Sequence, residues 1–509
     1  CQQATELSRY MRHFYASSAI ALCATTSAAE LTADDVWNDW ETYTHGLGYD
    51  VEGTQTRDGD ALTITGVTMR SNEGAGAGGI ILTIDRIVLT RQSDGTVTVE
   101  FPTIIPIEAT TPNETGGVTR VSLDYRQSGM SVVASGTADA IDYVYSADTV
   151  TLDTTGFEVN GQAMPAGTND VEITISDIAG TSATTVGNLR RYKQSMEAGS
   201  MRYQMAAADP STGIISNVSG QIQQLAFEGS GAVPLRDVDS ADFDAMLAAG
   251  FSADGTFDYA ANALTATVTD AQNPVETSIL SGPGTLGVTM NSQGLTYDVE
   301  QTGLQVDMMS SALPVPVSFS MRSASFKLAL PVRQSEEPDD FAFGFSLNEF
   351  TMSDMLWGMF DPGNLLPRDP ASIVLDLAGK ATLMVNFLDP NMVADLSPDT
   401  VPAEVETLDI NKLEVSVAGA ELTGDGGFTF ENNQGPMPQP QGAVDLTLKG
   451  GNGLIDKLVA GGLIGDQEAM GVRMMMGLLA VPGDTPDTLN SKIEINDQGH
   501  VLANGQRIQ

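Results

Sequence analysis

Few side chains in this 509-residue chain are of the kinds that usually carry out chemistry. There are two cysteines, Cys1 and Cys23, and three histidines, His13, His45 and His500. A zinc site or a Ser-His-Asp triad needs histidines that meet their partners in space, and this sparse spacing gives no reason to expect either. The sequence also contains no H-E-x-x-H and no G-x-S-x-G motif. We therefore predict that the protein is not an enzyme and has no catalytic residue, metal site or cofactor.

Two glycine-rich stretches match the G-x-G-x-x-G pattern of nucleotide-binding loops, Gly74–Gly79 and Gly282–Gly287. In a dinucleotide site the loop follows a strand and opens a helix, so that a phosphate meets the helix N-terminus. In this sequence strand-like residues follow both stretches. We interpret both as flexible loops and not as phosphate sites.

Two groups of acidic residues resemble calcium ligands. The stretch Gly450–Asp456 is like one unit of a calcium-binding β-helix repeat, but it occurs once and its aspartate comes one position late. Asp237, Asp239, Asp242 and Asp244 are crowded together without the glycine on which a calcium loop turns. We interpret these four as caps and solvated surface of a helix. An acidic, calcium-stabilised, adhesin-like exported protein stays the alternative.

The charge of the chain limits its partners. It has 24 Lys and Arg residues against 66 Asp and Glu residues, and a formal net charge of −42. Nucleic acids and anionic lipid surfaces repel such a protein. Hydrophobic residues make up 41% of the chain, which is more than a disordered acidic chain has. We predict a folded acidic protein that does not bind nucleic acid.

The first residues have the pattern of an export signal. A short basic segment begins at Met11, an apolar run covers 14–24, and Ser27 and Ala29 fall at the −3 and −1 positions of a cleavage site. We predict that residues 1–29 are an upstream extension plus signal peptide, cleaved near Ala29. No later run approaches the roughly 20 apolar residues of a membrane span. The predicted product is periplasmic, free of cysteine and without a transmembrane segment.

Most of the remaining sequence has β patterns. Segments that alternate apolar and polar residues recur, and Asp-Gly or Asn-Gly pairs separate them. Such pairs supply the positive φ of tight hairpins, as expected at Asp94-Gly95. Threonine-rich faces fit antiparallel sheets with one solvated face. We predict an α+β fold that is predominantly β, with large curved antiparallel sheets and a few short covering helices.

Helical patterns interrupt the β sequence. Thr32 can cap a helix in which Val36, Trp40 and Tyr43 share one face and which Gly46 ends. We interpret these aromatic residues as core anchors and not as a ligand site. Further helices are predicted at 240–250, 353–360, 454–461 and 466–479.

The predicted elements divide the chain after the signal into three regions. Residues 30–235 form an N-terminal helix and a β-rich region. Residues 236–340 form a central helix plus a β-rich region, and residues 341–509 form a C-terminal β-rich region with helices.

Methionine is unusually frequent, with 22 residues. Met308-Met309 and the run 474–476 lie in apolar sequence. Methionine is pliable and fills both irregular cores and adaptable apolar surfaces. We interpret these residues as core filler, with a groove for acyl chains or peptides as the alternative.

Three stretches resemble a known family. They are the helix 35–40 with its two tryptophans, the block 356–370 that ends in Leu-Pro-Arg-Asp-Pro, and the ending 504–507. Together they resemble family 2125 of the domains of unknown function, a family of exported alphaproteobacterial proteins, over most of the predicted mature chain. The resemblance implies a β-rich exported protein. The family has no established activity, so it implies no catalytic residue.

These observations favour a non-enzymatic binding or structural protein. A distant analogy, at the level of fold only, is to envelope proteins whose long curled sheets enclose apolar grooves that handle lipids. We predict an apolar groove whose partner is a lipid or an envelope protein. Within the resembling block, we predict that Arg368 and its neighbour Asp369 act as a charged pair that locks a loop.

Overall fold

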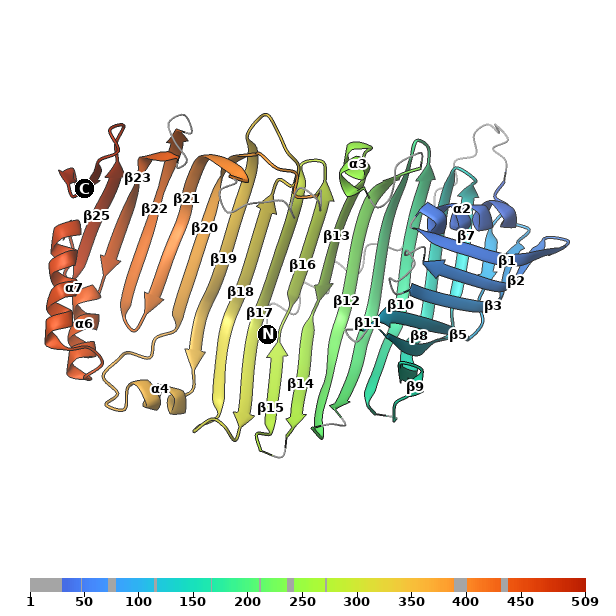
Figure 1. The fold of residues 1–509 in the computed structure, drawn as a ribbon, viewed down its shortest axis with the longest axis horizontal. Helices are drawn as coiled ribbons and strands as arrows, with labels where there is room; N and C mark the ends of the chain where they lie inside the picture. Colours follow the sequence, from blue (N-terminus) through green and yellow to red (C-terminus); the bar gives the residue numbers. More distant parts are fainter. Residues whose placement is uncertain are drawn as a thin grey trace.

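One antiparallel sheet forms the body of the protein (Figure 1). The computed structural model describes residues 30–46, 48–71, 79–113, 117–165, 167–209, 212–235, 242–270, 272–388, 401–431 and 438–509. In these residues the sheet has 27 strands, and the helices are short. The predicted α+β fold, predominantly β, is therefore confirmed. The predicted signal peptide lies outside the described residues.

The helices and strands have the following bounds. The helices are α2 (Ala33–Gly46), α3 (Phe243–Ala248), α4 (Asp354–Phe360), α6 (Gly451–Ala460) and α7 (Asp466–Leu479). The strands are β1 (Tyr49–Asp58), β2 (Ala61–Ser71), β3 (Gly79–Arg91), β4 (Val97–Glu100), β5 (Ile104–Pro112), β6 (Val118–Ser128), β7 (Ser131–Thr137), β8 (Ala140–Val159), β9 (Gln162–Ala163), β10 (Asn169–Val186), β11 (Leu189–Asp209), β12 (Ile214–Pro234), β13 (Ser252–Tyr259), β14 (Ala261–Thr269), β15 (Val275–Ser281), β16 (Gly284–Asn291), β17 (Gly294–Ser310), β18 (Val317–Leu330), β19 (Asp339–Met352), β20 (Ala371–Leu383), β21 (Ala403–Val417), β22 (Ala420–Glu431), β23 (Gln439–Lys449), β24 (Val481–Pro482), β25 (Thr488–Ile495), β26 (Val501–Ala503) and β27 (Gln506–Arg507).

The order of strands in the sheet follows the order in the chain. β8, β10, β11 and β12 lie side by side, and so do β17 to β23, followed by β25. Between β3 and β8 the sheet has two strand positions that are each shared by two shorter strands. β4 and β5 share the position next to β3, and β6 and β7 share the position next to β8. Between β12 and β17 the sheet again has two such positions, one shared by β13 with β14 and one by β15 with β16.

The breaks belong to a line of irregular positions, which we call the crease, that crosses the sheet from the break between β4 and β5 to β19. Pairing skips opposite residues on each neighbouring pair of strands at this level, for example Asp177 beside Asp148 and Gln224 beside Gly199. Residues with positive φ on the crease are Gly129, Asp177, Gln224, Gly303 and Glu349. Irregularities of this kind bend a strand. Because they lie at the same level, we infer that the crease bends the whole sheet along one line.

The main hydrophobic core lies where α2 packs against β1, β2 and β3 at the curled N-terminal end of the sheet (Figure 1). Thr32 caps the helix as predicted, since its hydroxyl accepts from the backbone NH of Asp35 at 3.2 Å. Trp37 is 3% exposed, and Trp40 stacks on Phe101 with ring centroids 5.8 Å apart. The interpretation as a core anchor is confirmed for Trp40, whereas Tyr43 is half-buried and lies outside this core. Trp37, which the helical stripe predicted from the sequence left out, is the most buried aromatic residue of the helix.

The other predicted helices are present. α7 has the predicted bounds, α4 begins one residue later with Ser353 as its N-cap, and α6 begins three residues earlier than predicted. α3 covers the central part of the predicted 240–250, and residues 236–241 lie outside the described residues. Among the described residues no helix has the length and apolar content to cross a membrane.

Candidate functional site

An apolar row of side chains runs across the sheet on one face. Residues directly opposite each other on antiparallel strands place their side chains on the same face. From β2 to β23 the successive partners are Leu62, Leu89, Val99, Val132, Tyr145, Gly180, Met196, Phe227, Phe257, Leu286, Val299, Phe326, Phe345, Leu375, Leu413, Gly424 and Leu446. No polar side chain interrupts this row, which we call the first apolar row.

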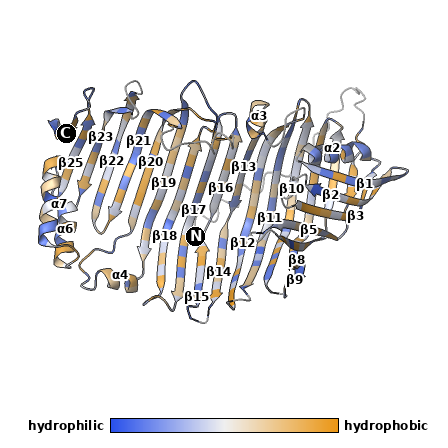
Figure 2. Cartoon of the chain, viewed as in Figure 1, coloured by the Kyte–Doolittle hydropathy of each residue, from blue (hydrophilic) through white to orange (hydrophobic). Residues whose placement is uncertain are grey.

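A second apolar row lies on the other side of the crease. Its partners from β5 to β19 are Ile105, Tyr125, Leu152, Ile173, Tyr203, Gly220, Leu264, Ile279, Val306, Phe319 and Met352. Both rows contribute to the lining of one cavity, so both lie on the same face of the sheet. Figure 2 shows the alternation of hydrophobic and hydrophilic residues along the strands that produces these rows.

The opposite face of the sheet is polar. One row there runs through Glu228, Thr256, Gly287, Asp298, Lys327, Gly344, Asp376 and Lys412. A sheet with one polar and one apolar face normally covers the apolar face with a second layer. In the described part of the chain, the first apolar row is fully buried only near α2, at Leu62, Leu89 and Val99, and is half-buried from Val132 onwards.

The two rows meet in a cavity of about 470 Å³ at the N-terminal end of the crease. Its lining is almost entirely apolar and consists of Leu82, Phe101, Ile105, Ile107, Tyr125, Met130, Val132, Tyr145, Ser146, Ala147, Val150, Ile175, Ile178 and Met196. Burial raises the pKa of Tyr125 and Tyr145, so both phenols stay neutral at physiological pH. The cavity therefore presents hydrocarbon and aromatic surface without a charge.

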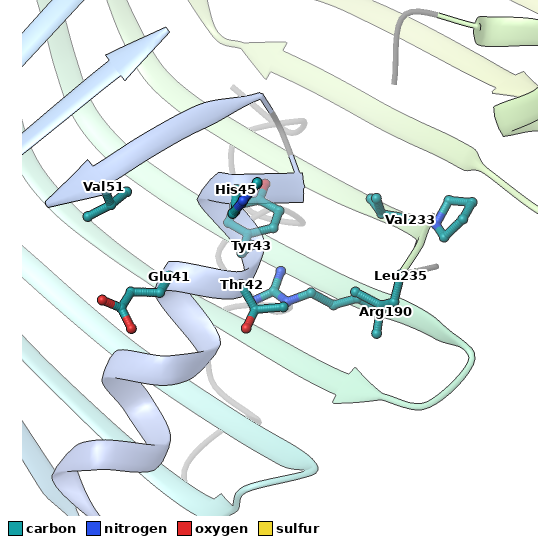
Figure 3. Close-up of a pocket in the computed structure, with 9 residues that line it drawn as sticks. Glu41, Thr42, Tyr43, His45, Val51, Arg190, Val233 and Leu235 are labelled. Carbon is teal, nitrogen blue, oxygen red and sulfur yellow. The ribbon is translucent and has the colours of Figure 1, made fainter. Parts of the chain in front are cut away.

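A second apolar cavity of about 260 Å³ lies under α2 and shares Phe101 with the first. Trp37, Trp40 and Met69 are among its lining residues. It adjoins a polar cavity of about 510 Å³ at the C-terminal end of α2, lined by Glu41, Thr42, Tyr43, His45, Val51, Arg190, Val233, Pro234 and Leu235 (Figure 3). The cavity under α2 shares Glu41, Tyr43 and Val51 with this polar cavity, which we call the polar mouth.

A buried charged network fixes α2 beside this mouth. Asp39 accepts two hydrogen bonds from Arg190, at 3.1 Å from Nε and 2.8 Å from Nη2. Tyr143 donates to Asp39 at 3.3 Å and accepts from Trp40 at 3.1 Å, and the Arg190 guanidinium lies 4.1 Å from the centre of the Tyr43 ring. Burial, with the charge of Asp39, raises the pKa of Tyr143. The positive charge of Arg190 is balanced by the negative charge of Asp39. We therefore infer that the network positions α2 and does not transfer protons.

Aromatic rings cover glycines within the sheet. The cross-strand partners of Gly180, Gly220, Gly231 and Gly284 are tyrosines whose rings occupy the space of a β-carbon at each glycine. At Gly180 the ring of Tyr145 lies 2.4 Å from such a carbon. In the two apolar rows these pairs keep the surface apolar where the chain has a glycine.

The glycine motifs do not form phosphate sites in the described residues. Gly282 lies between β15 and β16 and donates its NH to the carbonyl of Thr302 at 2.9 Å, and Thr302 donates back to Pro283 at 2.9 Å. The interpretation of this stretch as a flexible loop is therefore wrong, because neighbouring strands pair on both sides of it. In the first motif Gly79 begins β3, and residues 74–78 lie outside the described residues.

The acidic residues that resemble calcium ligands have other partners. Asp242 caps α3 by accepting from the NH of Ala245 at 2.9 Å, and Asp244 pairs with Arg333 at 2.6 Å. This confirms the interpretation as helix caps and surface for these two, whereas residues 237 and 239 lie outside the described residues. The stretch 450–456 begins α6, and Asp456 pairs with Arg473. No group of three or more His, Cys, Asp or Glu residues is placed to hold a metal in the described ranges.

The remaining sequence predictions have mixed outcomes. Met474 and Met475 are 73% and 62% exposed, so their interpretation as core filler is wrong. Arg368 does lock a loop, but its partner is Asp354 at the start of α4, and Asp369 is exposed. His45 lies at the polar mouth and His500 beside β26, at opposite ends of the sheet (Figure 1).

The fold and the rows define a class of protein: a single long antiparallel sheet with one extended apolar face. Residues 259–505 match the family described as "Uncharacterized protein conserved in bacteria (DUF2125)", so the predicted family is confirmed for this part of the chain. The match includes the Leu-Pro-Arg-Asp-Pro block, and the helix 35–40 lies outside it. A comparison with curated proteins finds no match.

Proposed function

We propose that the protein is exported to the periplasm and binds an elongated apolar ligand, such as the acyl chain of a lipid, along its two apolar rows. The observation that carries this proposal is the first apolar row, which continues without a polar side chain across seventeen strands. At about 4.8 Å between neighbouring strands, the row spans roughly 75 Å. The cavity near its N-terminal end is lined by residues of both rows and provides a recess for part of the ligand.

The energetics favour a hydrocarbon ligand. Each methylene group moved from water onto an apolar surface contributes up to about 0.8 kcal/mol when it is fully buried. A half-covered sheet face exposes apolar surface that gains the same type of stabilisation from the ligand. Since the cavity lining carries no charge, it cannot form an ion pair with a charged ligand. The polar mouth beside α2 has space for a ligand's polar end near the cavities.

Substitution on the first apolar row tests the proposal. Phe257→Lys places a charge within the row, whereas Thr256→Lys places the same side chain on the polar face, opposite Glu228. We expect Phe257→Lys to weaken binding of a fluorescent fatty acid at least tenfold and Thr256→Lys to leave it unchanged. Equal affinity for both variants and the wild type, or no binding by the wild type, contradicts the proposal.

Native material provides a second test of the same site. Protein purified from the periplasm of its own cell is extracted with organic solvent, and the extract is analysed by mass spectrometry for lipids. We expect a lipid in stoichiometric amount with the wild type and less with Phe257→Lys. Mass spectrometry of the intact protein in the same preparation checks export, since cleavage after Ala29 gives an N-terminus at Glu30.

A further inference from the structure

Helix α7 presents its apolar side to solvent. Met470, Met474 and Leu478 follow one another at intervals of four residues and are 69%, 73% and 58% exposed. Met475 beside them is 62% exposed, and Ala469 is the only buried residue of the helix. A surface helix of a soluble protein normally turns such residues inward. In the described part of the chain nothing covers this stripe, which we call the α7 stripe.

The helix is held firmly in this position. Asp487 accepts from the backbone NH groups of Asn452 and Gly453 at 3.0 and 2.9 Å and so fixes the start of α6. At the other end of the hairpin, the carbonyl of Leu479 accepts from the Ser491 hydroxyl at 2.6 Å and from the Asn504 amide at 3.0 Å. The α7 stripe is therefore a fixed surface and not a frayed terminus.

The C-terminal end of the molecule is less acidic than the chain is on average. Residues 449–509 contain five basic and seven acidic residues, whereas the whole chain has 24 and 66. From Ala469 to Gly483 the only charged residue is Arg473. The repulsion that keeps an acidic protein away from a phospholipid surface is thus weaker at this end than the average charge of the chain implies. Arg473 is paired with Asp456, so this part of α7 carries no net charge beside its exposed apolar stripe. An exposed apolar stripe on a helix is a feature of helices that lie in a membrane interface.

The α7 stripe also lies at the C-terminal end of the first apolar row. The row ends at Leu446 in β23, and the α6–α7 hairpin connects β23 to its neighbour β25. Figure 1 shows the hairpin at this edge of the sheet, with α4 near the same corner. Helix α4 adds exposed Met355, Met359 and Phe360.

We propose that the α7 stripe docks on the surface of a neutral phospholipid bilayer, at the end of the sheet where the first apolar row ends. The long, flexible methionine side chains fit the irregular packing of lipid headgroups and upper acyl chains. Transfer of a lipid from the bilayer to the apolar rows would rest on the proposed function. Docking itself does not depend on it.

Flotation of the full chain with phosphatidylcholine vesicles tests docking. We expect the wild type to float with the vesicles, and Met474→Glu to lower the vesicle-bound fraction at least tenfold. Met309→Glu is the matched control, because Met309 is also exposed, at 54%, but lies on β17 away from α7. Replacing one third of the lipid by phosphatidylglycerol should weaken binding, because the rest of the chain is acidic. Unchanged flotation of Met474→Glu overturns the proposal.

Two further measurements separate the alternatives. If sedimentation shows a wild-type dimer that Met474→Glu dissociates, and the wild type does not float, a second copy of the chain covers the stripe and the proposal is overturned. The variant Phe257→Lys should lose fatty-acid binding but still float. If the wild type binds fatty acid but does not float, the proposed function stands and the docking proposal is overturned. The two proposals can therefore fail separately.

Discussion

Arg190 and Asp39 form a two-hydrogen-bond ion pair that joins the start of β11 to α2 across 151 residues of sequence. Their side chains are 7% and 5% exposed. Two charges removed from water are tolerated only when their hydrogen bonds are satisfied, and Tyr143 supplies a further bond to the carboxylate. The pair therefore fixes α2 in one orientation over the apolar cavities.

Removal of one partner from this pair should destabilise the protein strongly. Arg190→Ala leaves the Asp39 carboxylate buried without its cation, and we expect a loss of about 3–5 kcal/mol in the free energy of unfolding. Urea denaturation followed by tryptophan fluorescence measures it. The double variant Asp39→Leu/Arg190→Met should recover most of the loss, since no charge is then buried. A single variant as stable as the wild type would show that the pair is open to water.

Asp361 should make stability dependent on acid pH. It is 3% exposed and accepts from the NH groups of Leu365 and Leu366 at 2.9 and 2.8 Å. The hydrogen bond from Leu365, with that from Leu366, lowers its pKa below the ordinary 3.8. A lowered folded-state pKa stabilises the protein above the ordinary value, and this stabilisation is lost as the pH falls through the folded-state value.

Asp361→Asn tests this pH dependence. The variant should be less stable than the wild type at pH 7. The difference should begin to shrink near pH 4, where the Asp361 carboxyl of the unfolded chain takes up a proton, and should vanish only at the lower pH where folded Asp361 is protonated. The exposed Asp369→Asn should differ little from the wild type at any pH. Urea midpoints between pH 7 and pH 3 check both, and a difference for Asp361→Asn that stays constant would contradict the assignment.

Gly180 should not accept a methyl group, although its backbone conformation allows one. A β-carbon there lies 2.4 Å from the Tyr145 ring and 2.7 Å from the carbonyl oxygen of Ser195. We expect Gly180→Ala to cost about 1–3 kcal/mol through overpacking. At Gly287 the nearest atom is 3.8 Å away, so Gly287→Ala should be neutral or stabilising by up to about 1 kcal/mol. Thermal unfolding of both variants compares them.

Arg368 should stabilise its loop through Asp354. Arg368→Ala removes the contact with the start of α4, and we expect a modest loss of about 0.5–1 kcal/mol because Asp354 is 87% exposed. The exposed Asp369→Ala should change stability by less than about 0.5 kcal/mol. Melting temperatures measure both. A larger effect from Asp369 than from Arg368 would restore the pairing expected from sequence.

Features set by neighbouring residues could be predicted from the sequence. The bounds of α7, the Thr32 cap and the hairpin turn at Asp94-Gly95 each depend on short stretches. The turn has the expected geometry, with Gly95 at φ 84° and the Asp94 carboxylate accepting from the NH of Thr96 at 3.1 Å. Local rules suffice for such elements because their energetics are local.

Features set by distant pairing could not be predicted. The Arg190–Asp39 pair has no local signal, and the first apolar row needs the register of every strand. The register also decides the role of Gly282, since a glycine motif in an isolated segment gives no sign that strands pair on both sides. Met474 and Met475 have the composition of core residues, and only their placement on the outer side of α7 distinguishes them.

From β18 to β22 each strand pairs only with the strand before it and the strand after it in the chain. Alternate strands run in the same direction, so two adjacent strands can be deleted or duplicated without reversing any neighbour. Each such event changes the length of the molecule by about 10 Å. Insertion or loss of a hairpin in this stretch would thus lengthen or shorten the distance between the curled N-terminal end and the α6–α7 hairpin by a fixed amount each time.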